Sequence, residues 1–146
     1  MEDSLREALM HVQLSQLLIP AKNVACVLRY NNLEHALLIL TKAGYTAVPV
    51  LDDHGSVCGT ISKTNILDAM LSTDKIDVDK LHEVLVEQAM TTKIPRLTTS
   101  DSFLKGMELL INNPFVCVLD AEEHFHGILT RRAVLIEIER KLRRRD

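Results

Sequence analysis

The sequence has 146 residues and a net charge of −3; 47% of its residues are hydrophobic, 3% are aromatic, and tryptophan is absent. This length fits one domain or a two-repeat module, and it can bury a core without a disulfide or a metal staple. The scarcity of aromatic side chains and the negative net charge argue against a nucleic-acid-binding protein. No run approaches the ~20 apolar residues of a membrane-spanning helix, so we expect no membrane association.

The three cysteines, Cys26, Cys58 and Cys117, each lie in an apolar stretch and form no C-x-x-C pair. Their number is odd, and two of the first four residues are acidic where a secretory leader would be basic. We therefore expect reduced cysteines packed in the core of a cytoplasmic protein.

The first half of the chain alternates between helical and strand-like apolar patterns. Serine at position 4 opens a capping box, and Pro20 interrupts the first helical pattern. Asn31 or Asn32 can cap the second helix, which Gly44 ends. In chain order we expect a helix at 4–17, a strand at 24–28, a helix at 33–43, a hairpin across 44–61 and a helix at 63–71.

The same pattern returns 68 residues later along the chain. Val50-Leu51-Asp52 reappears as Val118-Leu119-Asp120, and a polar linker at 72–79 separates the two copies. Two copies are too few for a solenoid, so they predict a tandem pair of small α/β units. The second copy is expected to contain a short helix at 81–88, a strand at 96–98, a helix from its cap at Asp101 to about 112, strands at 115–119 and 125–129, and a helix at 131–143.

Paired carboxylates at 52–53 and 122–123 are the only candidates for acid–base catalysis. Both pairs lie in predicted hairpin turns, where acidic residues are favoured for conformational reasons. His124 and His126 share a strand face, but two histidines are too few for a metal site. No nucleophile motif or phosphate-binding glycine loop is present. The sequence therefore predicts neither an enzyme nor a metalloprotein.

The most specific candidate site is Thr130-Arg131-Arg132, where a strand passes into a helix. A helix N-terminus offers free N–H groups to an anion, and arginine matches the geometry of phosphate. Two cations in a first helical turn oppose the helix dipole, which favours a phosphate ligand. The alternative is that both arginines face solvent or pair with glutamates. The basic end, residues 140–145, suits a helix C-terminus, although a partner surface stays open.

Each repeat resembles a CBS domain, a βαββα unit that works in tandem pairs called Bateman modules. Residues 44–50 with 59–62 carry the resemblance in the first repeat, and residues 115–118 with 127–130 carry it in the second. The resemblance implies an α/β (α+β) fold of two CBS repeats related by pseudo-two-fold symmetry, with an N-terminal helix. It divides the chain into residues 1–73 and 74–146. CBS pairs bind adenine nucleotides between the repeats and act as regulators without catalytic residues or a cofactor.

Further motifs are similar to free-standing bacterial CBS pairs that are receptors for cyclic di-AMP; they are residues 31–38, 44–47, 94–97, 111–113, 115–118 and 130–132. This likeness implies a homodimer whose unliganded form engages the bacterial (p)ppGpp synthetase/hydrolase. It also implies ligand contacts from the first strand, the second strand and the last helix. These residues are Lys22, Asn23, Ala25, Tyr45, Thr46, Ala47, Thr130, Arg131 and Arg132.

Many CBS units that bind AMP or ATP carry an aspartate three residues after the serine or threonine, where it bonds the ribose diol. Here Asn65 and Ala133 stand at those positions. A cyclic dinucleotide lacks half of that diol, so their presence suits cyclic di-AMP better. An AMP, ADP or ATP sensor is the alternative ligand class; an enzyme that uses the cleft and a structural dimerisation module are the alternatives of other classes.

Overall fold

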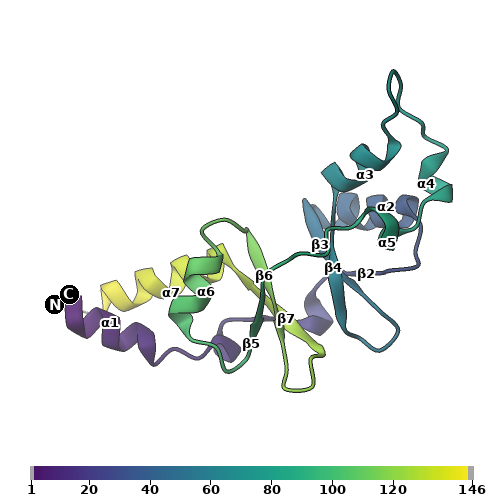
Figure 1. Ribbon diagram of the computed structural model, residues 1–146. Coiled ribbons are helices and arrows are strands. Elements are labelled where there is room, and N and C mark those ends of the chain that lie inside the picture. Colours follow the sequence, from purple (N-terminus) through teal and green to yellow (C-terminus); the bar gives the residue numbers. More distant parts are fainter. Residues whose placement is uncertain (1, 145–146) are drawn as a thin grey trace. The chain divides into compact units, whose positions relative to one another are not determined.

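The computed structural model describes residues 2–144, and the chain packs into two compact units (Figure 1). The central unit is Ala25–Ile94, and the terminal unit combines the chain up to Val24 with everything from Pro95 onward. The predicted division into repeats 1–73 and 74–146 concerns order along the chain and stays a prediction. Packing instead groups the N-terminal segment with the second repeat.

The central unit has a three-stranded sheet in the order β2-β3-β4, in which β3 pairs with β2 in parallel and with β4 in antiparallel fashion. Asn32 caps α2 by accepting a hydrogen bond from the His35 N–H, and Gly44 ends it with a φ of 74°. The elements are β2 (Val27–Leu28), α2 (Leu33–Ala43), β3 (Ala47–Leu51), β4 (Val57–Ser62), α3 (Lys63–Met70), α4 (Lys80–Glu83) and α5 (Val86–Ala89).

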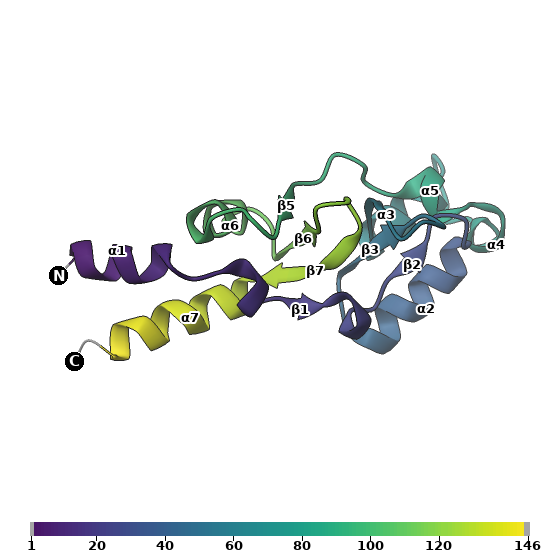
Figure 2. The ribbon, with the colours of Figure 1, turned by 90° about the horizontal axis from the view of Figure 1, so that it is seen from below.

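The terminal unit repeats this plan around a four-stranded sheet in the order β1-β7-β6-β5. Its first helix, α1, lies beside the last helix, α7, as Figure 2 also shows. The elements are α1 (Glu2–Met10), the 3₁₀ turn η1 (Leu14–Gln16), β1 (Ile19–Pro20), the 3₁₀ turn η2 (Ala21–Asn23), β5 (Arg96–Thr98), α6 (Phe103–Leu109), β6 (Phe115–Leu119), β7 (Phe125–Thr130) and α7 (Arg131–Arg143).

One glycine in the last strand of each unit lets a second backbone segment approach closely. In the terminal unit β1 pairs with β7, opposite Gly127; in the central unit Thr91 forms a bridge with Thr60, beside Gly59. A Cβ at either glycine would lie 2.3 Å from the carbonyl oxygen of that segment. The pairing of β1 with β7 explains why the start of the chain packs with the second repeat.

Each unit has its own hydrophobic core. Phe103, Leu97 and Leu129 are among the largest buried side chains of the terminal unit, together with Leu14 from η1. In the central unit the core includes Ile66 and Met70 of α3. The helical apolar pattern at 63–71 predicts that these two side chains lie on an exposed face for contacts between copies; the structure buries both, so this prediction is wrong. Among the residues that the structure describes, no helix is long and apolar enough to cross a membrane.

The predicted helix at 4–17 is wrong at both ends. It begins at Glu2, so Ser4 lies inside α1 and does not cap it, and it ends at Met10. Beyond that point Val12 and Leu14 turn inward to join the core, which a continued helix would not allow. The predicted strand at 24–28 is also shorter, because its ladder with β3 starts only at Val27, opposite Val50.

Three further boundaries differ from the sequence prediction. Ser102, not Asp101, caps α6, while Asp101 accepts a 2.7 Å hydrogen bond from the Thr98 N–H. The helix ends at Leu109 rather than near 112. The expected helix at 81–88 is split into α4 and α5, because the backbone between them bonds the start of α2: the Leu33 N–H donates to the Val84 carbonyl at 3.1 Å.

Candidate functional site

The start of α7 carries the residues that the sequence predicts to bind an anion. Strand β7 ends at Thr130, whose side-chain Oγ1 accepts a 3.1 Å hydrogen bond from the Ala133 N–H and so caps the helix. A hydroxyl that accepts one bond still has its own hydrogen to donate. Within residues 2–144, the Thr130 hydroxyl donates to no protein group. It can therefore donate to a ligand.

Arg131 is the first residue of α7, and its guanidinium has protein partners. Its Nε donates to the Leu110 carbonyl at 2.6 Å, and its Nη2 donates to the Ile111 carbonyl at 3.1 Å. Its backbone N–H donates to the Pro114 carbonyl at 3.2 Å. The residue thus joins the start of α7 to the segment between α6 and β6.

Arg132 differs from its neighbour because its side chain is exposed and has no hydrogen bond or ion pair within the described part of the chain. It lies in the first turn of α7, where the partial positive charge of the helix repels a cation. An anion beside it would relieve this repulsion. Of the two arginines, Arg132 is the one whose donors are all available to a phosphate.

The equivalent helix start in the central unit is closed by its own side chains. The hydroxyl of Ser62 donates to Asn65 Oδ1 at 2.9 Å and accepts from the Asn65 N–H at 3.0 Å. The Ser62 N–H also donates to Asn65 Oδ1, at 2.9 Å. Its hydroxyl hydrogen is therefore already used, whereas that of Thr130 is not. The repeats differ in this respect because Ala133 stands where the first repeat has Asn65.

Four of the predicted ligand residues lie at one end of the sheet of the central unit. Ala25 comes just before β2, and Tyr45 and Thr46 come just before β3, to which β2 is parallel. Ala47 begins β3 opposite Ser62. The Tyr45 side chain is 44% exposed, which leaves its ring available for stacking. The structure therefore brings these four residues to the same end of the sheet.

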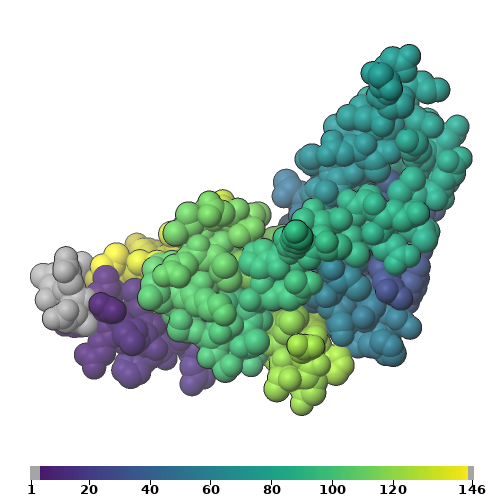
Figure 3. All heavy atoms as spheres, viewed as in Figure 1, coloured from purple at the N-terminus to yellow at the C-terminus, as the bar shows by residue number. Residues whose placement is uncertain are grey.

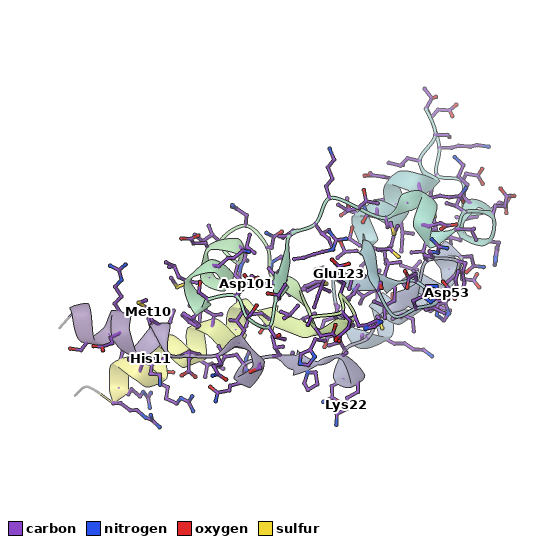
Figure 4. All side chains as sticks on the ribbon, turned by 60° about the horizontal axis from the view of Figure 1, so that its bottom comes forward. Met10, His11, Lys22, Asp53, Asp101 and Glu123 are labelled. Carbon is purple, nitrogen blue, oxygen red and sulfur yellow. The ribbon has the colours of Figure 1, made fainter. Side chains whose placement is uncertain are left out.

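Lys22 and Asn23 belong to η2 in the terminal unit, and both are exposed; Figure 4 labels Lys22. η2 follows β1, which runs antiparallel to β7 with Ile19 opposite Ile128 and Pro20 opposite Gly127. This direction leads away from Thr130 at the end of β7. Within the terminal unit the two residues are therefore not brought beside the start of α7, and their part in a common site stays a prediction.

The acidic pairs lie in the hairpin turns that Figure 4 marks at Asp53 and Glu123. Asp120 Oδ1 accepts the N–H groups of both Glu122 and His124 at 2.9 Å. These bonds, that from His124 first, lower the pKa of Asp120 below the usual range. Asp52 has a lowered pKa for the same reason, since it accepts the Ser56 N–H. The hydrogen bonds that lower these pKa values also stabilise the turns. A general acid needs a raised pKa instead, so the two aspartates are not suited to that role.

Asp120, Glu122 and His124 also bring potential metal-ligating atoms within 4.8 Å of one another. Glu122 and His124 are exposed, and the backbone bonds to Asp120 account for the cluster as a turn. Groups of this kind, two of them exposed, are common in turns without a metal ion.

The basic end of α7 is largely paired within its own helix. Arg140 and Lys141 contact the buried carboxylate of Glu137, and Arg143 contacts Glu139. Cations are also favoured at a helix C-terminus. The basic residues at the end of α7 are therefore explained by the stability that they give to the helix.

An apolar hollow of about 440 Å³ lies between α1 and α6, where Figure 3 shows the purple and green segments in contact. Leu5 and Leu9 line one side, and Phe103 and Met107 line the other. None of the predicted ligand residues borders it.

Comparison with known proteins identifies the family. Residues 14–72 match the CBS domain family. The chain is 44% identical over 137 residues to the cyclic di-AMP receptor B of Bacillus subtilis (strain 168), a match that covers 94% of this chain and 93% of that protein. The chain belongs to the CBS-domain proteins.

Solved structures of CBS-domain proteins agree over nearly the whole length. A CBS domain-containing protein of unknown function from Bacillus anthracis is 42% identical with a TM-score of 0.86, covering 93% of this chain and 99% of that chain. The CbpB protein of Listeria monocytogenes, solved in complex with c-di-AMP, is 42% identical with a TM-score of 0.82, covering 89% and 97% of the two chains. These relatives confirm the α/β fold of tandem CBS repeats.

Sequence reasoning about this CBS pair missed two roles that the structure assigns. Asn65 closes the first helix start, and Asn113 donates from Nδ2 to the Leu109 carbonyl at 2.8 Å beside the bonds of Arg131. A serine followed three residues later by asparagine, as at Ser62, was the available signal for the first role. The second role was missed because the sequence placed the end of the helix near 112, whereas α6 ends at Leu109, four residues before Asn113.

Proposed function

We propose that this CBS-domain protein is a non-enzymatic receptor for cyclic di-AMP that regulates a partner protein in a ligand-dependent way. The observation that carries the proposal is the pair of relatives that are 44% and 42% identical over nearly the full chain, of which one is named a cyclic di-AMP receptor and the other was solved with c-di-AMP. The open helix start at Thr130 and Arg132 supports it, because it offers an uncommitted hydroxyl and guanidinium to a phosphate.

In this proposal the start of α7 takes a phosphate and the central unit takes a base. Thr130 and Arg132 donate to phosphate oxygens, with Arg131 at the same helix start. Tyr45 stacks on an adenine, and the small side chains of Ala25 and Ala47 leave room for the flat ring. Thr46, Lys22 and Asn23 complete the set inferred from the sequence.

A ligand panel tests the choice of nucleotide. Isothermal titration calorimetry with cyclic di-AMP, AMP, ADP and ATP should give tight binding for cyclic di-AMP and weaker binding for the mononucleotides. The expected reason is that neither Asn65 nor Ala133 supplies a carboxylate for a ribose diol. Tighter binding of AMP, ADP or ATP would favour the mononucleotide sensor instead, and turnover of any bound nucleotide would reveal an enzyme.

The remaining parts of the proposal come from the sequence resemblance: a cytoplasmic homodimer whose unliganded form engages the (p)ppGpp synthetase/hydrolase. Exposed apolar side chains such as Leu67 and Ile136 are available for contacts between copies. Ligand and partner would be linked, so that each weakens the affinity for the other by the same factor. Titration of the synthetase with and without saturating cyclic di-AMP tests this link, and equal affinities would remove it.

A further inference from the structure

The two neighbouring arginines at the start of α7 are not equivalent. Arg132 is exposed and uncommitted, whereas the guanidinium of Arg131 makes two hydrogen bonds to carbonyls that follow α6. Building on the proposed function, we propose that Arg131 is a positioning residue: it holds the start of α7 in place for the ligand and makes no charged contact of its own with the phosphate.

The carbonyls of Leu110 and Ile111 need partners because they lie just beyond α6, where the regular hydrogen bonds of the helix have ended. In the central unit a left-handed Gly44 solves this problem for α2 by donating its N–H to the Leu40 carbonyl at 3.0 Å. The second repeat has Asn112 at the matching position, and its backbone does not adopt a positive φ. Side chains therefore take over at the end of α6, with Asn113 on the Leu109 carbonyl.

Arg131 also has a place in the chain that makes this contact useful to a ligand. It stands between Thr130, which offers the hydroxyl, and Arg132, which offers the free guanidinium. Its backbone N–H and its side chain both bond the segment from Leu110 to Pro114. Three hydrogen bonds thus fix the first residue of α7, and with it the direction of the residues on either side. A ligand then meets donors that are already ordered.

The guanidinium would have to leave its carbonyl partners in order to make a full bidentate contact with phosphate. The 2.6 Å bond from Nε is short, and breaking it would leave the Leu110 carbonyl without that donor. This bond is part-buried, which makes its loss unfavourable. Arg132 can supply a bidentate contact without any such cost, so the geometry divides the two roles between the two residues.

Two substitutions of Arg131 separate the role of its hydrogen bond to the Leu110 carbonyl from the role of its positive charge. In Arg131→Gln the amide nitrogen is the same number of bonds from Cα as the arginine Nε, so it can still donate to the Leu110 carbonyl without a positive charge. In Arg131→Lys the charge remains, but a methylene group stands where Nε was. Arg131→Met removes both, and Arg132→Met removes the proposed phosphate contact itself.

The measurements are cyclic di-AMP affinity by calorimetry at two salt concentrations and stability by chemical denaturation. We expect the affinity of Arg131→Gln to stay within roughly twofold of wild type. Arg131→Lys and Arg131→Met should lose roughly two- to tenfold in affinity, which is the value of one or two hydrogen bonds. These two variants should also be less stable. The salt dependence of binding should be unchanged in all three, whereas Arg132→Met should weaken it, because only that change removes a charge contact with the ligand.

Three results would overturn the positioning role. Wild-type affinity in Arg131→Lys together with a large loss in Arg131→Gln would mean that the charge itself binds phosphate. A reduced salt dependence in Arg131→Met would mean the same. Wild-type affinity in all three variants would mean that Arg131 does not contribute. Failure of wild-type protein to bind cyclic di-AMP would instead remove the proposed function, and the stability series would still test the contact with α6.

Discussion

The side-chain oxygen Oδ1 of Asn65 accepts a 2.9 Å hydrogen bond from the hydroxyl of Ser62, and the Asn65 N–H donates back to the same hydroxyl at 3.0 Å. The equivalent pair in the other repeat is Thr130 and Ala133, where alanine has no side-chain acceptor and only the backbone N–H bond is made. This difference of one side chain separates a closed helix start from an open one.

Ala133→Asn should therefore close the start of α7. We expect the new side chain to accept the Thr130 hydroxyl, which raises stability by about 0.5–1 kcal/mol and lowers cyclic di-AMP affinity by roughly two- to tenfold. Denaturation and calorimetry measure the two effects. Ala133→Leu is the matched control, since it adds similar bulk without an acceptor. An equal loss of affinity in the leucine variant would attribute the effect to bulk.

The turn at Glu123 predicts a stabilising substitution. Glu123 has a φ of 67°, and it is the only non-glycine residue with positive φ among residues 2–144. The matching position in the first repeat is Gly55, with a φ of 78°. An L-residue in this region costs about 1–2 kcal/mol of backbone strain, which glycine would remove. Glycine also raises the conformational entropy of the unfolded chain, which offsets part of that gain in stability. Glu123→Gly should raise the free energy of unfolding by about 0.5–1 kcal/mol.

Gly55→Ala is the control for that prediction and should be destabilising, because it imposes on the first repeat the strain that the second already carries. Both proteins can be compared by urea denaturation. If Glu123→Gly left the unfolding midpoint unchanged while Gly55→Ala lowered it, the positive φ of Glu123 would not be a source of strain.

The close backbone approach at Gly127 predicts a local defect. A Cβ there would lie 2.3 Å from the carbonyl oxygen of Ile19, so β1 would have to move away from β7. We expect Gly127→Ala to cost about 1–3 kcal/mol and to speed amide hydrogen exchange along β1. Gly59→Ala should act in the same way on the segment at Thr91. Unchanged exchange in β1 would show that the contact at Gly127 is not tight.

Acid should weaken the hairpin turns through their aspartates. Because the folded-state pKa of Asp120 is lowered, chiefly by the His124 N–H, its contribution to stability is present above the ordinary aspartate pKa near 4 and disappears as the pH falls through the folded-state value. Asp120→Asn should therefore be less stable than wild type at neutral pH, and the difference should shrink in acid.

Melting temperatures between neutral pH and pH ~2 check this prediction. Asp53→Asn is the control, since Asp53 is exposed and accepts no hydrogen bond in the described part of the molecule. A difference between wild type and Asp120→Asn that stayed constant over the whole range would rule out titration of Asp120 as its cause.

Sequence signals were reliable where the deciding contacts are local. Asn32 and Gly44 begin and end α2 through bonds within four residues, and both positions could be predicted. The repeat itself was visible because strand pairing, turns and caps recur with the same spacing. The end of α1 was missed because it depends on Leu14 entering a core formed largely by residues after 95.

The same distinction holds at the candidate site. That a strand passes into a helix at 130–132, with two adjacent arginines, followed from the sequence alone; anion binding there stays a prediction. That Arg131 is held by the Leu110 carbonyl, 21 residues away, did not follow from the sequence. Its partner is brought close only by the fold of the terminal unit, where the segment between α6 and β6 bonds the start of α7. Arginines that look identical in the sequence therefore differ in the folded chain.

The central claim is that Arg132 at the start of α7 binds a phosphate of cyclic di-AMP. Calorimetric titration of wild type and Arg132→Met with cyclic di-AMP tests it most directly, with circular dichroism as the control for folding. We predict a loss of about 2–4 kcal/mol, or roughly 30- to 1000-fold in affinity, the range for removing one partner of a buried charge pair, with an unchanged spectrum because the Arg132 side chain is exposed. Wild-type affinity in a folded Arg132→Met protein would contradict the account.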